Sequence, residues 1–229
     1  MSNPLLESTL LPPFSLIKPA DITPAVDKLL QQGREQIARL NDDVSSAEWD
    51  KVIAPLDSIN DALSQAWSPV SHLNSVLNSD ELREAYNENL PKLSAYWTEM
   101  GQNEGLFNAY RRVSEQSEGL DTAQKKVLEH NLLDFRLSGI DLPTDKKQRY
   151  ADIRQRLSEL STKFSENVLD ATQGWEKLIT DPEVLKGMPE MSLAAAKQAA
   201  EAKEKEGYLL SLEFPSYFPV ITHCDDRAL

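Results

Sequence analysis

Apolar residues recur at intervals of three and four positions along most of the chain, which predicts a mainly helical protein. The clearest such segment begins at Thr144-Asp145 and continues to about Val168. Its apolar face consists of Tyr150, Ile153, Leu157, Leu160, Phe164 and Val168. Charged and polar residues occupy the opposite face, as is typical of an amphipathic helix.

The same spacing predicts further helices over residues 23–40, 47–67, 79–101, 103–117, 121–137 and 189–206. Long helices joined by short connections are expected to lie antiparallel. No internal repeat of about 20–50 residues stands out, so we expect an irregular multi-helix array rather than a solenoid.

Capping residues and prolines set the expected helix boundaries. Thr23 followed by Pro24 is typical of an N-cap and a first-turn proline, and Ser79 and Asp121 are typical N-caps of later helices. Pro55 is expected to kink the second helix or to mark its true start, and the pair Ser68-Pro69 is expected to interrupt it.

The chain is expected to have three parts. Residues 1–22 contain four prolines among apolar residues, which predicts an extended arm that packs over the helical body. Residues 23–206 form the predicted helical domain. Residues 207–229 are expected to hold short strands and the start of a truncated helix.

Within that last part, the alternation in Tyr208–Phe214 predicts a strand. Pro215 and Pro219 bracket a second extended piece, so a short β-hairpin-like segment is expected near the C-terminus. Asp225-Asp226 resembles the cap of a helix with little room left to form, and we therefore expect the chain to be part of a longer protein.

Charge and cysteine content narrow the possible partners and the compartment. The 24 basic residues are outnumbered by 37 acidic ones, for a net charge of −13, which argues against nucleic acid or an anionic membrane as a partner. Neither a transmembrane run nor a signal peptide is expected. The single cysteine, Cys224, excludes an internal disulfide and fits a reducing compartment such as the cytoplasm.

The histidines do not form a zinc motif, which typically places two histidines four residues apart on a helix. His72, His130 and His223 are the only histidines, and none lies four residues from another. His130 is expected on a helix surface. His72 is expected either to cap a helix or bind tertiary partners, or to line a cleft. Cys224 is expected to be a packed cysteine, because adjacent residues on a strand face opposite ways and His223 would point away from it.

We therefore expect no catalytic, cofactor-binding or metal-ligating residue within this chain. The four tryptophans are expected to anchor the core. Tyr217 and Phe218 are expected to pack a strand onto the preceding helices. The alternative is that they present a surface to a peptide or another domain.

Several segments, in order, resemble one family. They are Ser68–Val76, Leu82–Tyr86, Asp134–Ile140 with Leu142-Pro143, Arg156–Leu160, Asn167–Thr172, Gly207–Leu210 and Pro215–Val220. Through them the chain resembles the N-terminal part of the thimet oligopeptidase-like zinc metallopeptidases, along nearly its whole length. None of these segments is catalytic. The resemblance therefore rests on all of the segments in their order and not on any single motif.

The resemblance implies a helical protein with a deep channel between an N-terminal and a C-terminal portion. It implies one zinc ion in the parent protein, with all ligands beyond this chain, so the chain alone is expected to be inactive. The parent is expected to be a cytoplasmic, monomeric metalloendopeptidase that hydrolyses short oligopeptides, including released signal-peptide fragments. This region would form a channel wall, with the C-terminal catalytic domain as its partner.

Two other interpretations stay open from the residues alone. One is a free-standing helical module that binds a peptide or helix in an apolar groove, and the other is a self-contained hydrolase with an unrecognised site. If the chain is one wall of a channel, it should expose apolar patches larger than the few hundred Å² usual for monomers.

Overall fold

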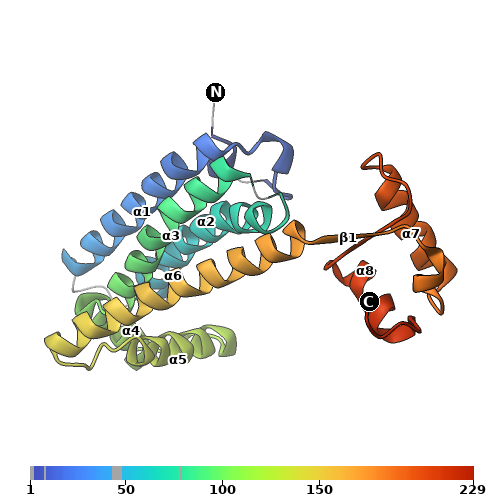
Figure 1. Cartoon of the computed structure of the whole chain (residues 1–229). Coiled ribbons are helices and arrows are strands. Elements are labelled where there is room, and N and C mark those ends of the chain that lie inside the picture. Colours follow the sequence, from blue (N-terminus) through green and yellow to red (C-terminus); the bar gives the residue numbers. More distant parts are fainter. Residues whose placement is uncertain (1–2, 8, 43–47, 78) are drawn as a thin grey trace. The chain divides into compact units, whose positions relative to one another are not determined.

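The computed structural model describes residues 3–7, 9–42, 48–77 and 79–229, and these are mainly helical, which confirms the predicted fold class (Figure 1). The chain forms two compact units, Met1–Leu160 and Ser161–Leu229. Each unit has its own cluster of buried apolar side chains.

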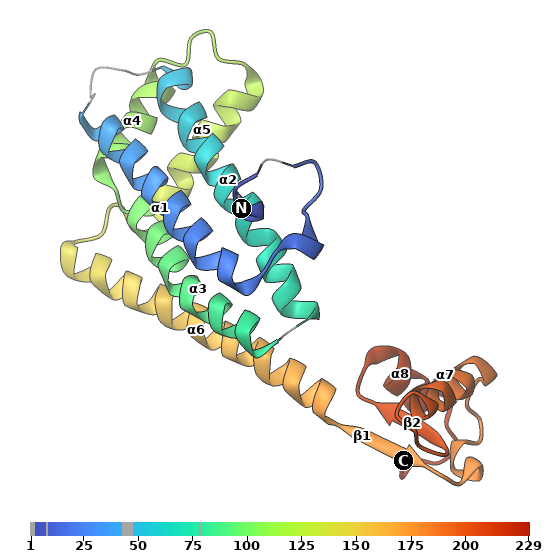
Figure 2. The ribbon, with the colours of Figure 1, turned by 90° about the horizontal axis from the view of Figure 1, so that it is seen from above.

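The first unit is built on three helices, α1 (Pro19–Asp42), α2 (Trp49–Val76) and α3 (Asp80–Gly101). They run in alternating directions, and α1 lies against both α2 and α3 (Figure 2). Their contacts bury large apolar side chains completely, among them Ile22, Ile53, Leu56, Leu63 and Tyr96. Burying such side chains stabilises the unit by about 1.5–3 kcal/mol each.

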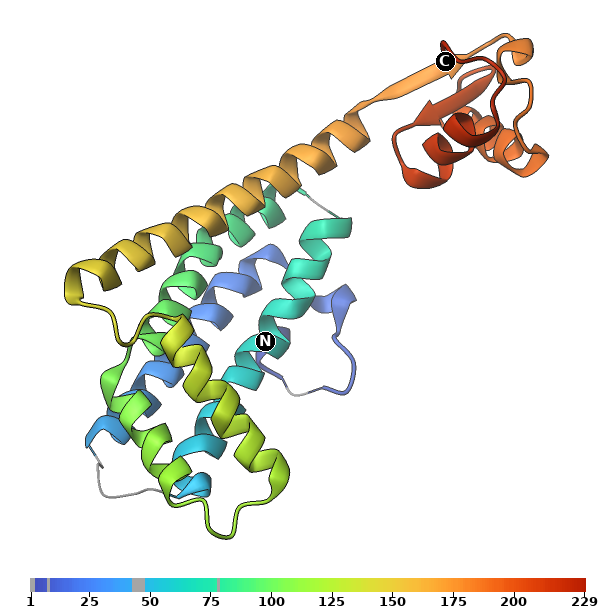
Figure 3. The same cartoon turned by 90° about the horizontal axis from the view of Figure 1, so that it is seen from below.

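Helices α4 (Glu104–Glu115) and α5 (Thr122–Leu137) form a hairpin that packs on this group (Figure 3). The predicted helix starts at Ser79 and Asp121 are confirmed. The Ser79 hydroxyl accepts a hydrogen bond from the backbone N–H of Leu82. Asp121 and Gln124 form a reciprocal capping box. Helix α6 (Thr144–Gly174) begins where its pattern predicted.

The predicted start of the first helix is wrong, because α1 begins at Pro19 and Thr23 lies inside it. The Asp21 carboxylate, in the first turn of α1, accepts a hydrogen bond from the backbone N–H of Lys18 at 2.9 Å, as the third helical residue does in a capping box. Thr23 instead accepts a hydrogen bond from the side chain of Asn89 on α3 at 2.7 Å. Its hydroxyl therefore joins two helices rather than ending one.

The expected interruption at Ser68-Pro69 is also wrong, because α2 continues through Pro55 and Pro69 to Val76. Pro69 costs the helix one backbone hydrogen bond, but Pro69, Val70 and Leu73 are all buried against the core. Burial of this face outweighs the lost bond. The helix starts at Trp49, and Ala47, where the pattern placed the start, lies outside the described residues.

Before α1, the N-terminal segment contains two single-turn helices, η1 (Pro4–Leu6) and η2 (Phe14–Leu16). The Asn3 side chain accepts from the backbone N–H of Leu5 and donates to the carbonyl oxygen of Asp21. Leu5 is buried in the core of the first unit. This contact fixes the beginning of the described chain against α1 and α2.

The second unit contains strand β1 (Glu176–Ile179), η3 (Pro182–Leu185), α7 (Glu190–Glu201), strand β2 (Tyr208–Ser211) and α8 (Phe214–His223). The strands pair antiparallel, with Glu176 opposite Ser211 and Ile179 opposite Tyr208. A short antiparallel two-stranded segment is therefore confirmed. The strand that pairs with β2 is β1, however, and not the piece bracketed by Pro215 and Pro219. The pattern missed β1 because it is four residues long and only Ile179 in it is buried.

The predicted extended piece at 215–222 is wrong, because these residues lie in helix α8. Pro215 occupies the first turn, where a helix needs no backbone donor. The expected helix start at Asp225 is wrong as well, since residues 224–229 form only bends and turns. Among the described residues, no helix is both long and apolar enough to cross a membrane.

Candidate functional site

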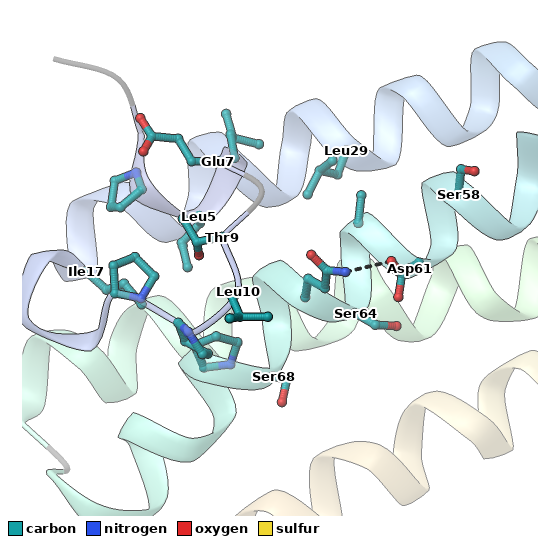
Figure 4. A pocket seen from close by; sticks show the side chains of 17 residues that line it. Leu5, Glu7, Thr9, Leu10, Ile17, Leu29, Ser58, Asp61, Ser64 and Ser68 are labelled. Carbon is teal, nitrogen blue, oxygen red and sulfur yellow. Dashed lines mark hydrogen bonds between the residues drawn. The ribbon is translucent and has the colours of Figure 1, made fainter.

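A cavity of about 600 Å³ lies between the N-terminal segment and helices α1 and α2 (Figure 4). Leu5, Ile17 and Leu29 are among its apolar lining residues. Helix α2 contributes polar groups from Ser58, Asp61, Ser64, Gln65 and Ser68. The Gln65 amide nitrogen donates to the Asp61 carboxylate at 2.7 Å. The cavity thus combines apolar surface with hydroxyl and carboxylate groups.

A second hollow of about 540 Å³ lies farther along α2 and shares Ser64 and Ser68 with the first. Its other lining residues are Trp67, Ser71, His72 and Ser75. His72 therefore lines a cleft, one of its two expected placements, and its ring lies 5.5 Å from that of Phe14.

Four serines, which we call the serine face of α2, connect these hollows: Ser64, Ser68, Ser71 and Ser75. Their intervals of four, three and four place them on one side of the helix. The Ser75 hydroxyl already donates to the carbonyl oxygen of His72 at 2.7 Å. A serine hydroxyl can both donate and accept a hydrogen bond, so Ser64, Ser68 and Ser71 can bind the N–H and C=O groups of an extended peptide. The sequence contained this signal, but the expected break at Ser68-Pro69 split it between two elements.

The other histidines lie on two different helices, and the cysteine directly follows the second of them. His130 is exposed on α5, as predicted, and His223 is exposed at the end of α8. Cys224 packs against the core of the second unit, and its thiol donates to the carbonyl oxygen of Val184 at 3.3 Å. Within the described part of the chain, no three His, Cys, Asp or Glu residues are grouped so that they could hold a metal ion.

Residues with a shifted pKa lie outside the lining of both hollows. The Lys147 ammonium donates to Glu104 at 2.8 Å and holds the pKa of that carboxyl below its usual value. Burial raises the pKa of Asp57, and burial also raises the pKa of the Tyr110 phenol. Catalytic acids and bases typically show such shifts inside a cleft. These shifted groups instead lie in helix packing and in ion pairs.

Helix α6 has no buried residue despite its length of 31 residues. Its apolar face, predicted from the spacing, is exposed: Ile153, Leu157, Leu160, Phe164 and Val168. The expectation that the chain exposes apolar patches larger than a few hundred Å² stays a prediction, with this face as its candidate.

Helix α8 also exposes apolar side chains, in this case aromatic ones. Phe214 is 64 % exposed, and Tyr217, Phe218 and Ile221 are exposed beside it. The rings of Phe214 and Phe218 stack at a centroid distance of 4.8 Å. The expectation that Tyr217 and Phe218 pack a strand onto preceding helices is therefore wrong, and their alternative role as a presented surface fits the structure.

A family model described as the neurolysin/thimet oligopeptidase N-terminal domain matches residues 26–147. Oligopeptidase A of Salmonella typhimurium is 55 % identical over 231 aligned residues, which cover 100 % of this chain and 34 % of that protein. Oligopeptidase A of Escherichia coli is 54 % identical with the same coverage. A probable cytosolic oligopeptidase A of Arabidopsis thaliana is 37 % identical, again over 100 % of this chain and 34 % of its own length. The chain thus spans about a third of the length of these curated relatives.

Proposed function

Because the chain belongs to the neurolysin/thimet oligopeptidase N-terminal domain family, we propose that it forms the N-terminal, non-catalytic region of a zinc metalloendopeptidase that hydrolyses short oligopeptides. The observation that carries the proposal is the identity of 54–55 % to two proteins named oligopeptidase A, which extends over the whole chain. The family match to an N-terminal domain supports the placement of this region in the larger enzyme.

The described residues do not fit a zinc site, since they include no suitable group of ligands. In our proposal the zinc ligands belong to the portion of the relatives that this chain does not match. The contribution of this chain is to bind and orient the peptide. We further propose a cytoplasmic, monomeric parent whose substrates include released signal-peptide fragments, a suggestion that rests on family resemblance alone.

We assign the channel wall to the serine face of α2 and its two hollows. Hydroxyl groups that bind peptide N–H and C=O groups do not depend on the side chains of the peptide. Such a wall therefore suits short unfolded peptides of varied sequence, while the apolar part of the first cavity can accept an apolar side chain.

The test is a chimera in which this chain replaces the matched third of the Escherichia coli protein. We expect chelator-sensitive hydrolysis of short peptides. The double variant Ser68→Ala/Ser71→Ala should raise KM by roughly 5–150-fold with kcat retained, because each of the two lost hydrogen bonds is worth about 0.5–1.5 kcal/mol. The control Ser165→Ala removes an exposed hydroxyl from α6 and should leave KM unchanged.

A well-folded chimera without peptidase activity would contradict the proposed function. Unchanged KM in the double serine variant would contradict only the assignment of the channel wall. Tight binding of peptides by the 229-residue chain alone would instead favour a free-standing binding module.

A further inference from the structure

Helix α8 has two chemically distinct faces, and only one of them is used inside the second unit. The inner face holds Ser216, Val220 and Cys224, at intervals of four. Val220 and Cys224 pack on the core of the unit, and the Ser216 hydroxyl accepts a hydrogen bond from the backbone N–H of Ser211 on β2 at 2.9 Å. These contacts fix the rotation of the helix about its axis.

The opposite side, which we call the aromatic face of α8, consists of Phe214, Tyr217, Phe218 and Ile221. The intervals of three and four place these residues together on the side away from the core. The ten residues of α8 include no Asp, Glu, Lys or Arg, although 27 % of the chain is charged. A solvated helix face normally carries charge, so this face has the composition of a contact surface.

We infer that the aromatic face of α8 is a docking surface for the part of an oligopeptidase A-type polypeptide that lies beyond the matched N-terminal third. This inference rests on the proposed function. The matched relatives extend over about three times the length of this chain, so the polypeptide beyond the matched third is large enough to supply a partner surface for this face. Aromatic side chains dominate the energetic centres of protein interfaces, and their fixed positions on α8 reduce the entropy lost on docking.

A second copy of the chain is a poorer occupant. Each copy carries a net charge of −13, so association of two copies is opposed by the repulsion between two chains of the same sign. A bound peptide is also a poorer occupant, since neither cavity described above is lined by a residue of α8.

The test compares hydrogen exchange of residues 214–223 in the isolated chain and in the Escherichia coli chimera described above. We expect exchange of these amides to slow by about tenfold or more in the chimera, since docking suppresses local opening. The double variant Phe218→Ser/Ile221→Ser should remove that protection. Phe218→Leu, which keeps an apolar side chain, should retain most of it.

Two controls separate docking from folding. Met191→Ser changes a residue that is 85 % exposed on α7 in the same unit, and it should leave the exchange of α8 unchanged. In the isolated chain, Phe218→Ser/Ile221→Ser should change the helix content and the melting temperature little, because Phe218 and Ile221 are 43 % and 64 % exposed and lie outside the core cluster of the unit.

Equal exchange of α8 in the isolated chain and the chimera would overturn the inference. So would loss of folding of the isolated chain in the double variant, or a dimer of the isolated chain that this variant converts to monomer. Unprotected α8 in a chimera with chelator-sensitive peptidase activity would overturn docking alone. Protected α8 in a chimera without that activity would contradict the proposed function alone.

Discussion

The substitution Gly33→Ala tests a close approach of α1 to α3. A Cβ atom at Gly33 would lie 2.2 Å from the hydroxyl oxygen and 2.8 Å from Cζ of Tyr96, well inside ordinary van der Waals contact. Tyr96 is fully buried, its hydroxyl donates to Asn60 at 3.4 Å, and the Trp97 ring lies 5.3 Å away. The tyrosine ring therefore has little freedom to move aside.

The expected cost follows from three contributions. Overpacking costs about 1–3 kcal/mol, and weakening of the Tyr96–Asn60 hydrogen bond adds about 0.5–1.5 kcal/mol. Alanine recovers about 1 kcal/mol through its higher helix propensity. We expect a net loss of about 0.5–3.5 kcal/mol, which for a unit of this size lowers the melting temperature by roughly 1–14 °C.

Urea unfolding followed by tryptophan fluorescence measures this loss. In a Trp175→Phe background, the remaining signal comes from Trp49, Trp67 and Trp97, all in the first unit. Gln32→Ala at the neighbouring exposed position should change the free energy of unfolding by no more than about 0.5 kcal/mol.

A gain in stability of about 1 kcal/mol for Gly33→Ala, as helix propensity alone predicts, would refute the close packing of Gly33 on Tyr96. The cost of Gly33→Ala should also become smaller in a Tyr96→Leu background, which removes the ring that the new Cβ atom meets. Strict additivity of the two substitutions would mean that they do not touch.

Two further predictions concern polar contacts. Thr23→Val should cost about 1–3 kcal/mol of unfolding free energy, measured by urea unfolding, because the fully buried Asn89 amide loses its hydroxyl acceptor. In Thr23→Val/Asn89→Leu, where both partners are apolar, most of that loss should disappear. The pKa of Glu176 is held below its usual value, first by the hydrogen bond from Lys203. Its contribution to stability should therefore be present above the unfolded pKa and vanish as the pH falls through the folded one. An NMR titration should show the Glu176 pKa below 4.5 and its return toward that value in Lys203→Gln.

The sequence predicted those parts of the fold that depend on local chemistry. Ser79 and Asp121 cap helices in the structure because their side chains satisfy nearby backbone donors. The prolines were harder to interpret, because their effect depends on tertiary packing. Pro69 is accommodated by burial within α2, and Pro215 begins a helix rather than bracketing a strand.

The candidate site was predictable only in part, because it too depends on tertiary packing. The periodicity of α6 identified its apolar face, but spacing alone could not show that this face is exposed. The serine face of α2 has regular helical spacing and became recognisable only when the helix proved continuous through Pro69. The inner face of α8 is set by its contacts with β2 and η3. Val184 of η3 lies 40 residues before Cys224, so the spacing of residues within α8 could not show which face is covered.

Pro69 has a chemical consequence for the wall that we assign to α2. Proline lacks an amide hydrogen, so the carbonyl oxygen of Gln65 has no N–H donor four residues farther along the helix. Gln65, Ser68 and Pro69 all line the first cavity. The lone pairs of this main-chain oxygen are left for water, a nearby hydroxyl or the amide of an incoming substrate. A residue usually regarded as a helix breaker thus supplies a backbone acceptor that no side-chain substitution at position 65 would remove.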